Sequence, residues 1–288
     1  MVVDKEPAWT SHDVVAKCRG IFGQRRVGHA GTLDPDATGV LLVGLGRVTR
    51  LLRFLTALPK TYTAEVVFGV ATSTLDSSGE VTGEWDMSGL TAEEAQAAAA
   101  QLVGPILQVP PMVSAVKVGG RRLHELARAG LEIERQARPV VVHRFDIQPS
   151  DEPNVVRIEV ECSSGTYVRT LAADLGTALG GGAHLRRLRR TAIGSFTAEE
   201  ATLIAALGQE AVLPPAAALR DHPAVTVDAE VALAVSHGKV LDEARLAVSG
   251  DGPWPVVDAD GRLLAVYERH GENRAKPAVV LGPEGAGT

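Results

Sequence analysis

The sequence has 288 residues, 45% of them hydrophobic and 22% charged, which is typical of a soluble globular protein with one large or two smaller domains. Its two cysteines, Cys18 and Cys162, exclude a disulfide framework, and no Cys or His spacing indicates zinc. No apolar stretch approaches the length of a membrane span and no signal peptide begins the chain, so we expect a cytoplasmic protein without membrane contact or metal.

The formal net charge of −6 argues against nucleic acid as a partner, but the charges are unevenly distributed. Residues 15–60 hold eight basic and two acidic residues, and residues 162–195 hold five basic and one acidic residue. The acidic residues concentrate in residues 74–100 and beyond residue 220. Since phosphate binding depends on the local field, two basic regions are compatible either with RNA binding or with ordinary solvated surfaces.

The N-terminal part predicts a helix, a polar loop and a second helix. Residues 10–13 resemble a capping box, and apolar residues at helical spacing predict a helix over residues 11–22. Arg47, Arg50 and Arg53 recur every three residues among leucines, which predicts an amphipathic helix with one basic edge.

The stretch between these helices, residues 27–46, contains a histidine, two aspartates and five glycines, and the apolar run 40–43 follows the polar part at once. We therefore expect a functional loop held against a buried strand or helix. Asp34 precedes a proline, so taken alone it is most typical of a turn or a helix start. The two glycines at 44 and 46 lack the rest of a dinucleotide or P-loop motif.

The middle of the chain mixes predicted strands and helices. We expect strands over residues 62–70, 140–148, 155–162 and 184–196, the last with a basic face. A polar loop over residues 72–83 carries Asp76. Helices are expected over residues 92–103, 167–179 and 198–207, and a hairpin around Gly119 and Gly120 with a short helix over 124–129.

Prolines at 214, 215 and 223 indicate a linker, and the segment beyond it predicts a small β-rich domain. Short strands are expected over residues 226–228, 247–249, 254–257 and 263–267, with a hairpin turn at Asp260-Gly261.

The loop sequence Gly28-His29-Ala30-Gly31-Thr32-Leu33-Asp34-Pro35 resembles the catalytic motif of the TruB-type pseudouridine synthases, the tRNA pseudouridine-55 synthases. Further blocks of that family are matched in the same order, at residues 60–62, 76, 110–123, 163–170 and 182–190. The resemblance covers residues 3 to 200, and the remainder is only loosely similar.

The resemblance implies an α+β fold: a mixed, largely antiparallel sheet with flanking helices, cut by a central RNA-binding cleft. It implies a catalytic domain over residues 1–215, with an RNA-clamping insertion, or thumb, at about 105–135, and a small PUA-like domain over residues 222–288. It also implies a monomer whose partner is the T stem-loop of tRNA.

The reaction implied is isomerisation of the T-loop uridine at position 55 to pseudouridine. The C1′–N1 bond breaks, the uracil turns, and a C5 bond forms, so no cofactor and no metal is required. A carboxylate beside the sugar or ring is required. The resemblance assigns this role to Asp34, which attacks C1′, attacks C6 or abstracts the 2′ proton.

The resemblance assigns further roles around Asp34. Arg169 is expected to pair with Asp34 and keep it ionised, because burial favours the neutral acid. Tyr62 is expected to stack on the base and assist proton transfer. The flipping of a uridine out of a folded arm costs a few kcal/mol, and His29 is expected to fill the vacated space. Other substrate-binding residues implied by the resemblance are Tyr167, Leu188, Asp76 and Lys5.

The chain departs from the family at its start, where Lys5-Glu6-Pro7-Ala8 replaces Lys-Pro-x-Gly. An edge strand there is expected to be short or missing, and Lys5 is a doubtful site residue. Two alternative functions stay open: an RNA-binding or tRNA-folding protein with secondary or no catalysis, and a pseudouridine synthase acting on another RNA.

Overall fold

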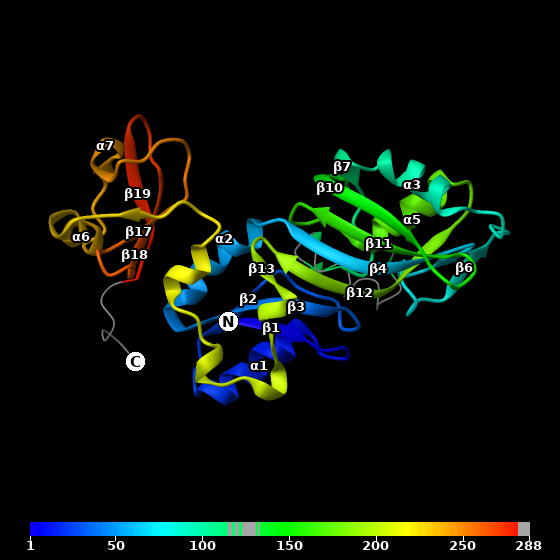
Figure 1. The fold of residues 1–288 in the computed structure, drawn as a ribbon, viewed down its shortest axis with the longest axis horizontal. Coiled ribbons are helices and arrows are strands. Elements are labelled where there is room, and N and C mark those ends of the chain that lie inside the picture. The colour runs from blue at the N-terminus through cyan, green and yellow to red at the C-terminus, as the bar shows by residue number, and fades with distance from the viewer. Residues whose placement is uncertain (115–116, 119–120, 123–130, 132, 282–288) are drawn as a thin grey trace. The chain divides into compact units, whose positions relative to one another are not determined.

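The computed structural model describes residues 1–114, 117–118, 121–122, 131 and 133–281, and the chain forms two compact units (Figure 1). The first unit contains residues 1–35, 40–58 and 194 onward, and the second contains residues 36–39 and 59–193. Strand β3 (Thr38–Leu45) contributes its first two residues to the second unit and the rest to the first.

The first unit begins with strands and one helix around a common core. Strand β1 lies between β14, to which it is parallel, and β3, which is antiparallel to β2. The core contains Val3 of β1, Val14 and Cys18 of α1, and Leu41 of β3. The bounds here are β1 (Val2–Lys5), α1 (Ser11–Phe22), β2 (Val27–Ala30), η1 (Gly46–Leu51), α2 (Leu52–Ala57), β13 (Phe196–Thr197), η2 (Ala198–Glu200), β14 (Thr202–Leu203), η3 (Ile204–Ala206), η4 (Gln209–Ala211) and η5 (Pro215–Leu219).

Helix α1 confirms the prediction from local sequence. Thr10 accepts a hydrogen bond from the Asp13 amide while the Asp13 carboxylate accepts one from the Thr10 amide, so both ends of the capping box are present. Gly23 ends the helix in the left-handed conformation at φ 58°. The N-terminal edge strand that was expected to be short or missing is present as the four-residue strand β1, and it is not an edge strand because it has neighbours on both sides.

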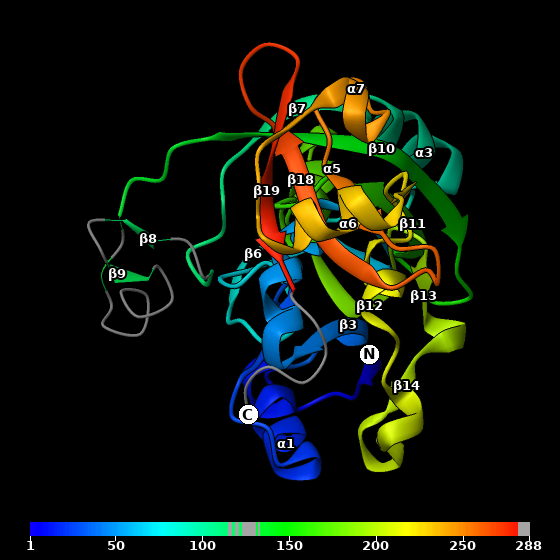
Figure 2. The same ribbon diagram turned by 90° about the vertical axis from the view of Figure 1, so that its left-hand side faces the viewer.

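The C-terminal part of the first unit is a five-stranded sheet with two helices, and Figure 2 shows α6 beside β18. Trp254 and Tyr267 are buried in its core, and the Tyr267 hydroxyl donates to the Lys239 carbonyl at 2.8 Å. The bounds are β15 (Val225–Thr226), α6 (Ala229–Ser236), β16 (Leu241–Asp242), α7 (Glu243–Leu246), β17 (Trp254–Val257), β18 (Leu263–Arg269) and β19 (Arg274–Val280).

The second unit is built on antiparallel strands in the order β12, β4, β11, β10 and β7, with the first residues of β3 parallel to β12. Helix α5 packs on β12 and α3 on β10 (Figure 1). The bounds are β4 (Lys60–Phe68), β5 (Val70–Thr72), β6 (Val81–Glu84), α3 (Ala92–Ala100), β7 (Gly104–Gln108), β8 (Lys117–Val118), β9 (Arg121–Arg122), β10 (Arg138–Pro149), β11 (Val155–Cys162), α5 (Val168–Ala178) and β12 (Ala183–Ile193).

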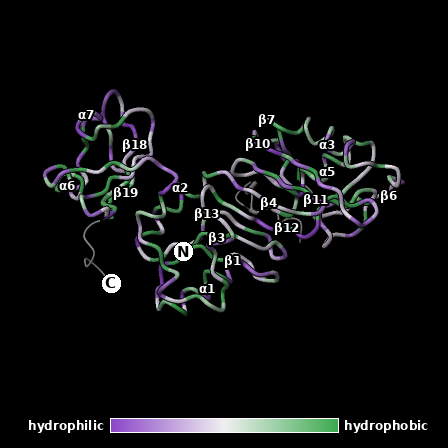
Figure 3. Tube along the Cα trace, viewed as in Figure 1, coloured by the Kyte–Doolittle hydropathy of each residue, from purple (hydrophilic) through white to green (hydrophobic). Residues whose placement is uncertain are grey.

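Strand β4 shows why this sheet forms. Its residues alternate strictly between buried and half-buried, with Tyr62, Ala64, Val66 and Phe68 on the buried face. Figure 3 shows hydrophobic and hydrophilic residues mixed along the strands of this unit, as a sheet with one covered face requires. The predicted α+β fold class is thereby confirmed.

Two of the predicted helices and strands were wrong. Residues 198–207 do not form one helix: a capping box between Thr197 and Glu200 begins a single turn, and residues 202–203 then pair with β1. Residues 247–249 are not a strand, because α7 ends there with Ala247 in the left-handed conformation. Helix α6 and strand β19 were not predicted. In the segment expected to form the thumb, β8 and β9 pair in antiparallel orientation. The turn expected at Gly119-Gly120 and the helix expected at 124–129 lie outside the described residues.

Candidate active site

Asp34 lies half-buried in the loop that joins β2 to β3. No helix begins at Asp34 or Pro35, so the reading of this residue as a helix start was wrong, and the apolar run after the loop is the strand β3. His29 of β2 faces Val43 of β3 across an antiparallel pair. The loop therefore connects two paired strands, and this pairing fixes both of its ends.

Two side chains from outside the loop hold its middle. The Ser11 hydroxyl, at the start of α1, accepts from the Leu33 amide at 2.9 Å and donates to the Leu33 carbonyl at 3.3 Å. The Lys5 ammonium donates to the carbonyls of Pro35 (2.9 Å), Trp9 (2.8 Å) and Glu6 (3.0 Å). Lys5 is fully buried, so the residue expected among those that bind substrate is enclosed by protein beside the loop.

His29 also contacts a second histidine. The rings of His12, at the first turn of α1, and His29 meet edge to face with centroids 5.4 Å apart. This arrangement suits aromatic rings and restricts the orientation of the His29 side chain.

Gly39 fixes the next point along the chain. It adopts φ +102°, and a Cβ added there would lie 2.1 Å from the Arg190 carbonyl oxygen of β12. Only glycine permits both this backbone conformation and this approach of β3 to β12.

The second unit holds the remaining predicted site residues. Tyr62 is buried on β4, and Tyr167 immediately precedes α5. A buried residue missed by the sequence reasoning positions Tyr167: the Gln108 side chain accepts from the Tyr167 amide at 2.7 Å and donates to the Tyr167 carbonyl at 3.1 Å. Gln108 is the last residue of β7, and nothing in its sequence neighbourhood singles it out.

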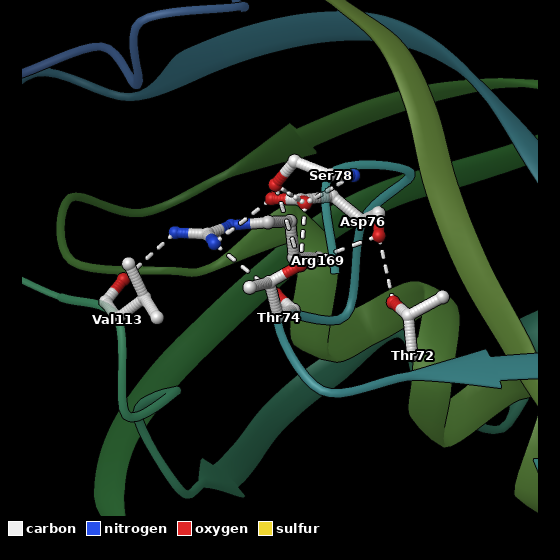
Figure 4. A network of polar contacts seen from close by, with 6 residues as sticks. All are labelled: Thr72, Thr74, Asp76, Ser78, Val113 and Arg169. Carbon is white, nitrogen blue, oxygen red and sulfur yellow. Dashed lines mark hydrogen bonds and ion pairs between the residues drawn. The ribbon is translucent and has the colours of Figure 1, made fainter. Parts of the chain in front are cut away.

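Arg169 and Asp76 form an ion pair at 3.0 Å that joins α5 to the polar loop between β5 and β6 (Figure 4). The Arg169 side chain is 5% exposed, and its guanidinium also donates to the carbonyls of Thr74 and Val113. Asp76 was expected to bind substrate and Arg169 to pair with Asp34, and the structure brings Asp76 and Arg169 together.

The Asp76 carboxylate is held in its ionised form. One oxygen accepts from the hydroxyls of Thr74 and Ser78 and from the Ser78 amide. Burial acts to raise the pKa of Asp76, but the hydrogen bonds from Ser78 and Thr74 and the charge of Arg169 together lower that pKa below its usual value. The loop is also tied to β12, because Asp76 bridges to Leu185.

Several arginines of the two basic regions have partners within the protein. Arg47 and Arg50 donate to the carbonyls of Leu281 and Val280, and Arg53 pairs with Glu268 at 2.6 Å. In β12, Arg190 is buried, while Arg186 and Arg187 both bind Glu65. Part of the positive charge counted in the sequence is therefore neutralised by internal contacts.

The predicted site residues divide between the two units. Lys5, His29 and Asp34 belong to the first, whereas Tyr62, Asp76, Tyr167, Arg169 and Leu188 belong to the second. The pairing of Asp34 with Arg169 stays a prediction. Within the part of the chain that the structure describes, no helix is long and apolar enough to cross a membrane.

Solved structures share this fold. A chain from an H/ACA RNP bound to a substrate RNA containing 2′-deoxyuridine aligns with a TM-score of 0.74 at 22% identity, covering 98% of this chain and 84% of that one. A chain from a Cbf5-Nop10-Gar1 complex aligns with a TM-score of 0.74 at 25% identity, covering 99% and 83%. The likeness defines the class of fold: a mixed sheet with flanking helices, and a further β-rich sheet towards the C-terminus.

Sequence comparison defines the family within this class. Residues 19–168 match the TruB family pseudouridylate synthase N-terminal domain, residues 169–216 the tRNA pseudouridylate synthase B C-terminal domain, and residues 222–282 the tRNA pseudouridine synthase II C-terminal domain. The chain belongs to the TruB family of pseudouridine synthases.

Relatives named tRNA pseudouridine synthase B are similar along nearly the whole chain. The protein of Rhodococcus jostii RHA1 is 46% identical over 290 residues, covering 98% of this chain and 93% of the relative. The protein of Mycobacterium tuberculosis H37Rv is 44% identical, covering 98% and 95%. The protein of Symbiobacterium thermophilum is 52% identical over 239 residues, covering 81% and 80%.

Proposed function

We propose that this protein is a tRNA pseudouridine synthase that isomerises the T-loop uridine at position 55. The observation that carries the proposal is the likeness, over 98% of the chain, to proteins named tRNA pseudouridine synthase B. The rigid loop around Asp34 supports it, because a reacting carboxylate must be held in a fixed place. The protein acts in the cytoplasm as a monomer on the T stem-loop of tRNA.

The reaction rearranges bonds within one nucleotide. The C1′–N1 bond breaks, the uracil turns, C5 bonds to C1′, and the C5 proton leaves while N1 gains one. Atoms and electrons balance without an oxidant. The Asp34 carboxylate acts on the ribose or the ring of the extruded uridine, and the paired strands and the Ser11 contacts keep it in place.

The other site residues keep the roles that the resemblance to the family implies. Tyr62 stacks on the uracil and assists proton transfer at C5, Tyr167 lines the pocket, and Leu188 closes it. His29 takes the space left by the flipped base and is oriented by His12. Stacking of this kind contributes about 1–3 kcal/mol per base.

Arg169 keeps the reacting carboxylate ionised through its positive charge. Asp76 orients Arg169 rather than contacting RNA, since its carboxylate is engaged by Arg169, Thr74 and Ser78. Lys5 likewise supports the site by holding the loop carbonyl of Pro35.

The test is Asp34→Asn, compared with Asp36→Asn in the same loop. Asp36 is an exposed carboxylate two residues away, so its substitution controls for loss of local charge. With tRNA carrying 5-tritiated uridine, Asp34→Asn is expected to abolish tritium release while tRNA binding survives, and Asp36→Asn is expected to release tritium at nearly the normal rate.

Normal tritium release by Asp34→Asn would contradict the assignment of the reacting carboxylate. Binding and refolding of tRNA by the unsubstituted protein without any tritium release would contradict the enzymatic function and favour a tRNA-folding protein.

A further inference from the structure

Strand β12 carries an extra residue at two points where it pairs with β4, and the first of them lies between Arg186 and Arg189. Arg186 faces Glu65 and Arg189 faces Thr63, so residues 187 and 188 share the single position opposite Ala64. Arg187 adopts φ +54°, a left-handed conformation that few residues other than glycine take up. The irregularity is a β-bulge, a feature that redirects the side chains following it.

The bulge decides on which face of the sheet Leu188 lies. Side chains alternate along a strand, and Tyr62 and Ala64 lie on the buried face of β4, opposite to Thr63. Leu188 precedes Arg189, which faces Thr63, so Leu188 falls on the face of Ala64 and Tyr62. Without the extra residue Leu188 would itself face Thr63, and its side chain would leave the face of Tyr62.

One carboxylate holds both residues at the start of this bulge. Glu65 Oε2 accepts from Arg186 Nε at 2.5 Å, and Oε1 accepts from Arg187 Nη1 at 2.9 Å. The Glu65 side chain is 14% exposed, whereas the Arg187 side chain is 69% exposed. Consecutive residues of a regular strand point to opposite faces, so Arg186 and Arg187 reach the same carboxylate only because the strand is bulged here.

The two ion pairs stabilise the bulge against the register that lacks it. A left-handed backbone at Arg187 is unfavourable by itself, and charge-assisted hydrogen bonds to Glu65 offset this. A glutamine at this position keeps one acceptor oxygen and presents an NH2 group to the other arginine, so it cannot hold both.

We propose that Glu65 is a positioning residue of the active site: by binding Arg186 and Arg187 together, it sets the β12 bulge that places Leu188 on the face of Tyr62. The proposal rests on the proposed function, in which Tyr62 stacks on the target uracil and Leu188 closes the pocket. Neither Glu65 nor Arg187 needs to touch the RNA.

The experiment measures the single-turnover rate of pseudouridine formation and, separately, the Kd for tRNA. Glu65→Gln and Arg187→Val, whose β-branched side chain disfavours the left-handed backbone, are each expected to slow the rate about tenfold with Kd within about twofold. Arg187→Gly, which adopts that backbone freely, is expected to keep the rate within about twofold. In the Arg187→Gly background, Glu65→Gln should cost much less than it does alone.

The matched control is Glu152→Gln. Glu152 binds Arg186 at 2.6 Å and is 50% exposed, and its hydrogen-bonding partner in the bulge is Arg186. The Glu152→Gln substitution removes a carboxylate that binds the same arginine and leaves the Glu65 contacts in place. The single-turnover rate is therefore expected to stay within about twofold of normal.

Two results would overturn the proposal. One is an unchanged rate for Glu65→Gln. The other is a Kd for tRNA that rises about fivefold or more in Arg187→Gly, together with a fall in the rate of similar size. That result would make Arg187 a phosphate-binding residue. Hydrogen exchange at residues 183–193 without RNA provides an independent reading: faster exchange is expected in Glu65→Gln and Arg187→Val, and not in Arg187→Gly.

An unsubstituted protein that forms no pseudouridine would end the proposed function. The exchange measurement would still decide whether Glu65 sets the bulge, so the two failures are distinguishable.

Discussion

Asp76 and Arg169 lie 93 residues apart in sequence, and their ion pair was not predictable from either neighbourhood. A polar loop is typical of exposed carboxylates, yet this one joins the buried guanidinium of α5 and fixes the loop to β12 through Leu185. The identity of both residues as site residues came from the resemblance to a family. The contact between them is a tertiary contact that exists only once the sheet has folded.

Asp76→Asn is expected to destabilise the protein by about 2 kcal/mol near pH 7, because it leaves a buried arginine without its counter-charge. The pKa of Asp76 is lowered in the folded state, so the stability it contributes is present above its unfolded-state pKa and is lost as the pH falls through the folded-state value. The difference in stability between the two proteins should therefore shrink as the pH is lowered below about 4. Urea unfolding across this pH range measures it.

The control is Glu80→Gln, which removes an exposed carboxylate from the same loop. A difference for Asp76→Asn that stays constant down to pH 2.5, or that Glu80→Gln reproduces, would contradict the assignment of the pKa shift to this ion pair.

At the scale of elements, the sequence predicted correctly those helices and strands that are determined by contacts between residues close together in the chain. Helix α1 begins at its capping box, and β4 follows its alternation of apolar and polar residues. The segment after Thr197 carries a capping box too, but its pairing with β1, almost two hundred residues earlier, ends the helix after one turn. The bulge at Arg187 is equally invisible in the sequence, because it depends on a carboxylate of another strand.

Gly39→Ala is expected to destabilise the protein by about 3 kcal/mol or more, since a Cβ there collides with the Arg190 backbone and φ is +102°. Gly20→Ala, inside α1 with nothing within 4 Å of the added Cβ, is expected to stabilise by about 1 kcal/mol. Chemical denaturation of the two variants measures both changes in the free energy of unfolding, one a decrease and the other an increase. A Gly39→Ala protein as stable as the original would show that β3 does not need this close approach to β12.

At the scale of the molecule, the arginines of η1 and α2 hold the C-terminal part of the first unit. Leu51 and Phe54 are buried together with Leu263, Val266 and Val279 in one apolar cluster. Around this cluster Arg47 and Arg50 donate to carbonyls of the last described residues, so the basic edge predicted from the sequence, although exposed, also forms an interface with residues 280–281. Charge counts along a sequence cannot distinguish such an interface from a phosphate-binding surface.

The double substitution Arg47→Gln with Arg50→Gln is expected to speed hydrogen exchange in β19 while leaving the salt dependence of tRNA binding unchanged. The reason is that each guanidinium is held by a hydrogen bond to the carbonyl of Leu281 or Val280. A fall in the slope of log K against log salt of about one for each arginine removed would show instead that they contact phosphates.

The central claim is that this chain forms pseudouridine at position 55 of tRNA through Asp34. The most direct test maps pseudouridine in all RNA of the source organism after deletion of the gene and after its restoration. The account predicts that the T-loop pseudouridine of tRNA is lost on deletion, returns with the original gene, and does not return with Asp34→Asn. Persistence of that pseudouridine in the deletion strain, or loss of modification from a different RNA alone, would contradict it.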